Sequence, residues 1–256
     1  MRVLRLGNSE DTSPGIPDEA RAWYFAGKRL EEVSGERVET VLRPIWPGRE
    51  LPALLDGWLD DHQPDVVFIK VTWFWYAYES VPRRIERLLG RAGKPIAKAG
   101  LGAAKKPRLA RNRAFKLGRR MAHRLIGGDT PFDSSQVLEV MEACIRKVVA
   151  RENIVLVVKG TGGAKQDVEA LAGFYGRFTT RRLEVEGGIE RLCKSLHVTY
   201  VGVPPRPPGE KQDLKGGDGL HQGQSGQQRM GMIEGAALAD AWLAAHPSPL
   251  AETTAP

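Results

Sequence analysis

The two ends of the chain carry residues of the types that catalyse acyl transfer. Ser9 follows the first apolar run, and Asp218 and His221 lie near the other end. A serine hydroxyl is a weak nucleophile until a neighbouring base takes its proton. Histidine can act as that base near neutral pH, and a carboxylate fixes its tautomer and stabilises the imidazolium. These residue types predict Ser9 as a nucleophile with Asp218 and His221 as its base pair; a turn serine and a loop histidine are the alternatives.

Asp218 and His221 are spaced so that their side chains can contact each other. They are three residues apart on one turn, and Gly216, Gly217 and Gly219 give the backbone the freedom for a close approach. Such a turn would present the carboxylate to the ring nitrogen of His221 that faces away from the serine.

Five short apolar runs predict the β-strands that would position these residues. They are residues 3–6, 37–42, 65–69, 154–158 and 198–203. Between them, apolar residues recur three and four positions apart, as in amphipathic helices; one such stripe is Val81, Ile85, Leu88 and Leu89, and the last helix is expected at residues 225–245. Strands that alternate with helices are typical of a parallel sheet covered on both faces. The predicted fold is therefore α/β, with three layers (α/β/α) around a five-stranded parallel sheet.

In an open parallel sheet, ligands bind beyond the carboxyl ends of the strands. Besides Ser9 and His221, the residues expected at that edge include Gly48, Thr72 and the aromatic run Trp73-Phe74-Trp75. The run predicts an apolar wall beside the nucleophile that holds an acyl or aryl group. Packing beneath a loop is the alternative for these rings.

Two short motifs resemble those of a known family, the SGNH (GDSL-type) hydrolases. Gly7-Asn8-Ser9 resembles the family's nucleophile block, which usually reads Gly-Asp-Ser, and Asp218-Gly219-Leu220-His221 resembles its Asp-x-x-His block. The resemblance covers about residues 1–245 as architecture, but only these two blocks match as motifs. It implies a flavodoxin-like fold and a serine esterase, acyl hydrolase or acyltransferase. Such an enzyme works through an acyl-serine intermediate, without a cofactor, on a small-molecule ester or acyl substrate.

The family's third block is not matched. It normally reads Gly-x-Asn-Asp and should follow Ile69, where this chain has Lys70-Val71-Thr72-Trp73. In the family, that asparagine donates to the oxyanion, beside the N–H groups of the nucleophile and of a second-block glycine. The resemblance assigns those two N–H groups to Ser9 and Gly48, with Thr72 or the Trp73 indole in place of the asparagine. Loss of one donor typically costs about 10²–10³ in turnover, so a binding protein of this fold with impaired catalysis is an alternative.

A long basic segment lies in the middle of the chain. Ten Lys or Arg residues and no acid occur between Lys98 and Arg124, whereas the whole chain has a net charge of +7. We expect a basic insertion at about residues 98–126 that is either a solvated face or a surface for an anionic partner. A phosphorylated carrier or an anionic lipid headgroup fits this charge. Nucleic acid is disfavoured, because the segment lacks flanking aromatics and any known module.

A glycine-rich loop gives a second functional alternative. Gly160-Thr161-Gly162-Gly163 follows a predicted strand and precedes a helix, a context in which backbone N–H groups can hold phosphate. The loop is neither a Walker loop nor a GxGxxG fingerprint. A phosphate- or nucleotide-binding α/β protein is therefore an alternative to the hydrolase.

The rest of the composition is ordinary for a globular protein. We expect one domain over residues 1–246 and a disordered tail at 247–256. Cys144 and Cys193 lie on apolar helix stripes, where cysteine is usually a small buried hydrophobe, and no cysteine or histidine cluster suggests a metal. Neither a membrane-spanning run nor a secretory leader is visible, so a cytoplasmic location is expected.

Overall fold

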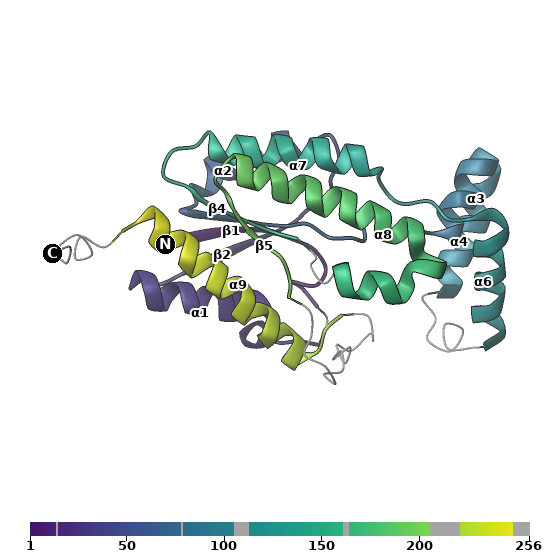
Figure 1. Cartoon of the computed structure of the whole chain (residues 1–256), viewed down its shortest axis with the longest axis horizontal. Helices are drawn as coiled ribbons and strands as arrows, with labels where there is room; N and C mark the ends of the chain where they lie inside the picture. The colour runs from purple at the N-terminus through teal and green to yellow at the C-terminus, as the bar shows by residue number, and fades with distance from the viewer. Residues whose placement is uncertain (14, 78, 105–112, 161–163, 205–220, 248–256) are drawn as a thin grey trace.

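A computed structural model of the chain describes residues 1–13, 15–77, 79–104, 113–160, 164–204 and 221–247. Five strands form one sheet in the order β2-β1-β3-β4-β5, and all neighbouring strands are parallel (Figure 1). The strands are β1 (Arg2–Gly7), β2 (Glu39–Pro44), β3 (Val66–Lys70), β4 (Val155–Lys159) and β5 (Thr199–Val201). The five-stranded parallel sheet and the approximate place of each strand are therefore confirmed.

Helices cover both faces of this sheet. α1 and α9 lie on one face, and α2, α7 and α8 lie on the other (Figure 1). The helices are η1 (Asp18–Ala20), α1 (Ala22–Ser34), α2 (Leu51–His62), α3 (Val81–Leu89), η2 (Gly90–Ala92), α4 (Gly93–Ala104), α6 (Arg113–Ile126), α7 (Ser134–Val149), α8 (Ala164–Ser195) and α9 (Gln224–Ala245). The predicted three-layer α/β/α architecture is confirmed.

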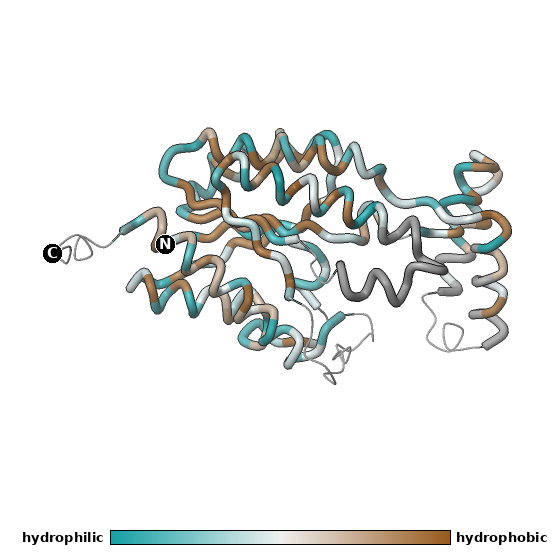
Figure 2. The backbone as a smooth tube through the Cα atoms, in the orientation of Figure 1, coloured by the Kyte–Doolittle hydropathy of each residue, from teal (hydrophilic) through white to brown (hydrophobic). Residues whose placement is uncertain are grey.

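Two hydrophobic cores lie on either side of the sheet. β3 and β4 are buried along their whole length, which explains why they read as continuous apolar runs. The core towards α2, α7 and α8 includes Leu6, Leu55 and Met141, and the core towards α1 and α9 includes Leu30 and Phe68. Figure 2 shows these hydrophobic strands enclosed between the two helix layers.

The helices α3, α4 and α6 do not cover the sheet. They pack on one another at one end of the molecule, and we call residues 81–104 and 113–126 the helical lobe (Figure 1). Leu88 and Leu89, which belong to the predicted apolar stripe, are 57% and 53% exposed. The periodicity predicted the amphipathic character of α3 correctly. Of the helices that lie between β3 and β4 in the chain, however, α7 is the one that packs on the sheet.

Both cysteines are free and buried, as expected. Burial raises the pKa of each thiol, that of Cys144 and that of Cys193, to about 12. They are therefore inert parts of the core. Among the helices that the structure describes, none has the length and apolar character that crossing a bilayer requires.

Glycines allow α1 and α9 to approach closely. A Cβ at position 231 would lie 2.6 Å from the carbonyl oxygen of Ala22 and 2.6 Å from Cβ of Phe25. At position 235 it would lie 2.9 Å from Cβ of Arg29. This contact holds α9, and the residues just before it, against the rest of the fold.

We expect Gly231→Ala to lower the free energy of unfolding by about 1–2 kcal/mol, because overpacking costs more than the helix propensity that alanine adds. Gly57→Ala in α2 is the matched control, since its Cβ would meet no atom within 4 Å. That substitution should raise stability by up to about 1 kcal/mol. Urea unfolding measures both values, and equal effects of the two substitutions would contradict the close approach.

Candidate active site

The loops after β1 and before α9 meet at the carboxyl edge of the sheet. Nε2 of His221 lies 3.0 Å from Oγ of Ser9, although 212 positions separate the residues in the sequence. This is hydrogen-bond reach, the distance that a general base requires. Ser9 is exposed and His221 is partly exposed, so a substrate can reach both side chains.

Short-range hydrogen bonds shape the loop that carries Ser9. The side-chain oxygen of Asn8 accepts from the N–H of Glu10 at 2.9 Å, and the N–H of Asp11 donates to the carbonyl oxygen of Asn8 at 3.0 Å. The Asp11 carboxylate in turn accepts from the N–H of Asn8 at 3.0 Å. Asparagine and aspartate commonly close turns in this way. The loop is thus a tight turn with the Ser9 hydroxyl at its surface.

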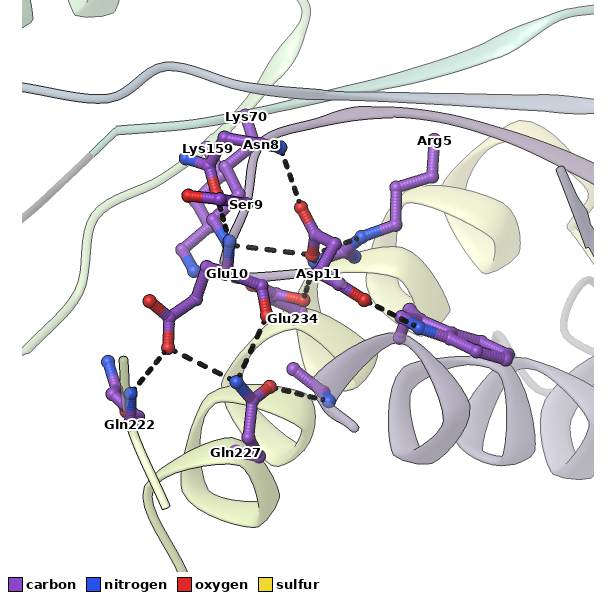
Figure 3. Close-up of polar contacts among 12 residues, drawn as sticks. Arg5, Asn8, Ser9, Glu10, Asp11, Lys70, Lys159, Gln222, Gln227 and Glu234 are labelled. Carbon is purple, nitrogen blue, oxygen red and sulfur yellow. Dashed lines mark hydrogen bonds and ion pairs between the residues drawn. The ribbon is translucent and has the colours of Figure 1, made fainter. Parts of the chain in front are cut away.

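A buried ion pair fixes this turn to the sheet. Asp11 is 3% exposed, and its Oδ1 accepts from Nε and Nη2 of Arg5 at 2.9 and 2.6 Å (Figure 3). Nζ of Lys70 lies 3.4 Å from the same oxygen, and the Asp11 carbonyl accepts from the indole of Trp23 at 3.2 Å. Burial alone would raise the pKa of Asp11, but the charges of Arg5 and Lys70 and the Asn8 N–H hold it well below its ordinary value.

The ion pair belongs to a larger buried cluster. Nη2 of Arg5 also lies 2.8 Å from Oε2 of Glu234 in α9, and Lys159 is paired with the same carboxylate. The cluster therefore contains three basic side chains and two carboxylates. Burial opposes the charge of Glu234, yet Arg5 and Lys159 lower its pKa, whereas burial lowers the pKa of Lys159. Arg5 also stacks over the Phe68 ring, with its guanidinium carbon 4.6 Å from the ring centre.

Glu10 connects the serine turn directly to the histidine segment. Its Oε1 accepts from the N–H of Gln222 at 2.9 Å and from Nε2 of Gln227 at 3.1 Å. The amide oxygen of Gln227 accepts from the N–H of Ala22 at 3.0 Å. The buried side chain of Gln227 therefore joins α9 to the serine turn and to the start of α1 (Figure 3). The hydrogen bond between Gln222, which follows His221, and Glu10, which follows Ser9, therefore sets the position of His221 relative to Ser9.

The expected oxyanion donors differ in their availability. The N–H of Gly48 donates to the carbonyl oxygen of Trp46 at 2.8 Å, and a Cβ at position 48 would lie 2.2 Å from Oε1 of Glu50. In this arrangement the Gly48 N–H serves its own turn. Thr72 follows β3 and is partly exposed. The N–H of Ser9 donates to no other residue in the described part of the chain.

The aromatic run divides between the surface and the core. Trp46, Trp73 and Phe74 are exposed at the carboxyl edge, and the partly buried Phe132 lies beside Trp46. The ring centres of Trp46 and Phe74 are 6.1 Å apart, those of Trp73 and Phe74 are 6.4 Å apart, and those of Trp46 and Phe132 are 6.3 Å apart. We call these four rings the aromatic patch. Trp75, by contrast, is 1% exposed and packs in the core, so it does not face a ligand at this edge.

Several expected features lie outside the described residues. They are Asp218 with the glycines around it, residues 161–163 of the glycine-rich loop, residues 105–112 of the basic insertion and residues 248–256 of the expected tail. Gly160 is described, and it allows a close approach of another kind, since a Cβ there would lie 1.9 Å from Oη of Tyr200. Within the part of the chain that the structure describes, no three histidine, cysteine or acidic side chains are grouped to hold a metal ion.

The sequence reasoning missed the residues that support the site. Glu10 and Asp11 were not expected to have a role, because acidic residues in a polar loop usually face solvent. One signal was present: Arg5, Lys70 and Lys159 interrupt otherwise apolar strands, and the strand register places them on one face. Cations on the same buried face require carboxylate partners, and the adjacent loop and the last helix supply them.

The sequence matches no protein-family model, and no curated protein matches it. Solved structures do resemble the fold. A psychrotrophic esterase, EstA from a Pseudoalteromonas species, superimposes with a TM-score of 0.52 at 12% identity, over 95% of this chain and 98% of that chain. TesA gives 0.53 at 14% identity over 94% and 99%, and a G-D-S-L family protein from Desulfitobacterium hafniense DCB-2 gives 0.51 at 10% identity over 92% and 98%. The predicted flavodoxin-like fold of SGNH hydrolases is therefore confirmed.

We expect Asp11→Asn to lower the free energy of unfolding by about 3–5 kcal/mol at pH 7, because it leaves Arg5 buried with part of its counter-charge removed. Because the pKa of Asp11 is lowered on folding, its contribution is complete above the unfolded value of about 4 and declines as the pH falls below it. The difference between the wild type and the variant should therefore shrink from pH 4 downwards.

Urea unfolding over a pH series measures this difference. Asp18→Asn is the control, since Asp18 is 62% exposed and pairs with Arg21 at the surface. It should cost less than about 1 kcal/mol. A difference between wild type and Asp11→Asn that stays constant down to pH 2 would exclude the buried pair as its source.

Proposed function

We propose that the protein is a serine esterase of the SGNH type, with Ser9 as nucleophile and His221 as general base. The single observation that carries this proposal is the 3.0 Å contact between Ser9 Oγ and His221 Nε2 at the carboxyl edge of the sheet. The fold and the chain order of the two residues support it. Asp218 is assigned the third role on its motif, in which it would fix the tautomer of His221.

The reaction follows from this geometry. His221 Nε2 takes the proton of Ser9 as Oγ attacks the ester carbonyl carbon, and the carbonyl oxygen gains a negative charge. Collapse of this intermediate breaks the bond to the alcohol, which leaves with the proton from His221. Water, deprotonated by the same imidazole, then attacks the acyl-serine and releases the acid. An alcohol acceptor in place of water would make the enzyme an acyltransferase.

The oxyanion is assigned to the loops around Ser9. The N–H of Ser9 is the first donor, and Thr72 or the Trp73 indole is the second. The Gly48 N–H can contribute only if it leaves the carbonyl of Trp46, to which it donates at 2.8 Å. The buried cluster also places the cations Arg5 and Lys70 against Asp11 of this loop, and cations near the site favour an anionic transition state.

The aromatic patch indicates the substrate. Trp46 follows β2, and Trp73 and Phe74 follow β3, at the edge where Ser9 follows β1. The N–H of Ile45 donates to the carbonyl of Gly7 at 3.0 Å, which ties the segments after β1 and β2 together. Exposed Trp46, Trp73 and Phe74 offer a flat apolar surface for an aryl or acyl group. We therefore assign a small ester with one apolar group as substrate.

A second candidate is a ligand-binding protein of the same fold that does not turn over. The observation in its favour is the Gly48 N–H, which is engaged with Trp46, together with the missing third-block asparagine. Such a protein would bind an ester at the aromatic patch without forming an acyl-serine. Covalent labelling separates the two candidates, because only an activated serine reacts.

We expect a fluorophosphonate probe to label the wild type at Ser9, and Ser9→Ala to abolish labelling and to lower chromogenic ester hydrolysis by at least about 10³-fold. EstA was solved inhibited by a phosphonate, which supports the choice of reagent. Ser195→Ala is the matched control, because Ser195 is an exposed serine at the end of α8. Mass spectrometry locates the adduct; hydrolysis that survives Ser9→Ala would overturn the nucleophile assignment, and an unlabelled wild type would favour the binding protein.

We expect Glu10→Ala to lower kcat about ten- to a hundredfold while Glu10→Gln keeps near wild-type turnover. The amide oxygen of glutamine can accept the two hydrogen bonds from Gln222 and Gln227, whereas alanine releases the histidine segment. Stopped assays with a soluble ester give kcat and KM separately, and thermal unfolding checks the fold. Equal turnover of the two variants would exclude Glu10 as a positioning residue.

A further inference from the structure

The charge of the molecule is concentrated in the helical lobe. Residues 81–104 and 113–126 contain eleven Lys or Arg residues and one acid, Glu86, so the lobe carries a net charge of +10, whereas the whole chain carries +7. Arg83, Arg91, Lys94 and Lys98 are exposed on α3, η2 and α4. The part of the chain that the structure describes thus has one strongly cationic end.

The same lobe exposes large apolar side chains. Of the fourteen large hydrophobic residues that are exposed in the described part of the chain, six lie in the lobe, and they are between 52% and 80% exposed. They are Leu88, Leu89, Ile96, Leu117, Met121 and Leu125. Cations interspersed with exposed leucines on surface helices are the composition that binds at a lipid–water interface.

The lobe is held together independently of the sheet. A Cβ at Gly93 would lie 2.6 Å from the carbonyl oxygen of Ile85, so α4 passes directly against α3. At its base, Ser80 and Asp129 exchange two backbone hydrogen bonds of 2.9 and 3.2 Å, and Nε of Arg87 lies 2.9 Å from the Asp129 carboxylate. These contacts close the loop that carries the lobe, so its helices project from the body as one unit (Figure 1).

We propose that the helical lobe binds the surface of an anionic lipid membrane. Each cation of the lobe is attracted to the anionic headgroups, and these favourable free energies add up over the lobe. Its exposed leucines and Met121 insert at the boundary between headgroups and acyl chains. The exposed apolar residues distinguish this partner from nucleic acid, which offers no apolar layer to receive aliphatic side chains. The proposal is independent of the chemistry at Ser9.

Vesicle co-sedimentation of the whole protein tests this proposal. We expect binding to vesicles that contain phosphatidylglycerol, weakening with added salt, and little binding to pure phosphatidylcholine. Lys94→Gln with Lys98→Gln should weaken the apparent affinity by about tenfold or more. Leu88→Ser with Leu89→Ser should weaken it similarly, since the inserted apolar area is lost.

Matched substitutions on the body are the controls. Leu54→Ser on α2 removes a leucine that is 48% exposed, and Arg191→Gln with Lys194→Gln on α8 removes two exposed cations. Both should bind vesicles like the wild type, and so should Ser9→Ala, which separates this test from that of the esterase. Equal binding to neutral vesicles, or binding unchanged by the lobe substitutions, would overturn the proposal. Tighter binding to an RNA oligonucleotide that is unaffected by the leucine substitutions would overturn it in favour of nucleic acid.

Discussion

A guanidinium buried in the middle of a strand is the constraint on which the rest of the structure depends. Arg5 is 1% exposed, and a charged group taken out of water costs several kcal/mol unless other charges compensate it. The two carboxylates that compensate it come from the loop after β1 and from α9. The requirement to neutralise one side chain therefore holds together a strand, the turn that follows it and the last helix.

This arrangement positions the Ser9 hydroxyl without contacting it. The Asp11 carboxylate is held by ion pairs with Arg5 and Lys70 and by a hydrogen bond from the N–H of Asn8. The turn has little freedom to move, so Ser9 at its tip has a defined direction. Glu10 extends the same turn towards the segment before α9. Preorganisation of this kind is what catalysis by a positioned nucleophile and base requires, because small displacements of either group slow the reaction strongly.

Much of the fold and the central contact could be predicted from the sequence. Continuous apolar runs gave the strands, since both faces of the sheet are covered, and the two motifs at the chain ends gave Ser9 and His221. The sequence did not predict which element packs against each apolar helix face. The stripe of α3 is a genuine amphipathic pattern, but periodicity does not say whether a sheet, a neighbouring helix or nothing covers its leucines.

The supporting residues were missed for a related reason. Residue type places Glu10 and Asp11 in solvent by default, and only the three-dimensional position of Arg5 reverses that expectation. In the aromatic run, Trp75 is buried, whereas Trp73 and Phe74 are exposed, because the chain turns there: the N–H of Trp75 donates to the carbonyl of Thr72 at 3.2 Å. Neighbours in sequence thus face opposite environments.

The pairing of β1 with α9 also has a consequence for biosynthesis. Arg5 is translated well before Glu234, which belongs to a helix that follows all five strands. On a nascent chain the sheet could form only by enclosing a cation that still lacks one of its counter-ions, which is unfavourable. Docking of the last helix supplies this second carboxylate, so we expect the unpaired charge to disfavour compaction of unfinished chains.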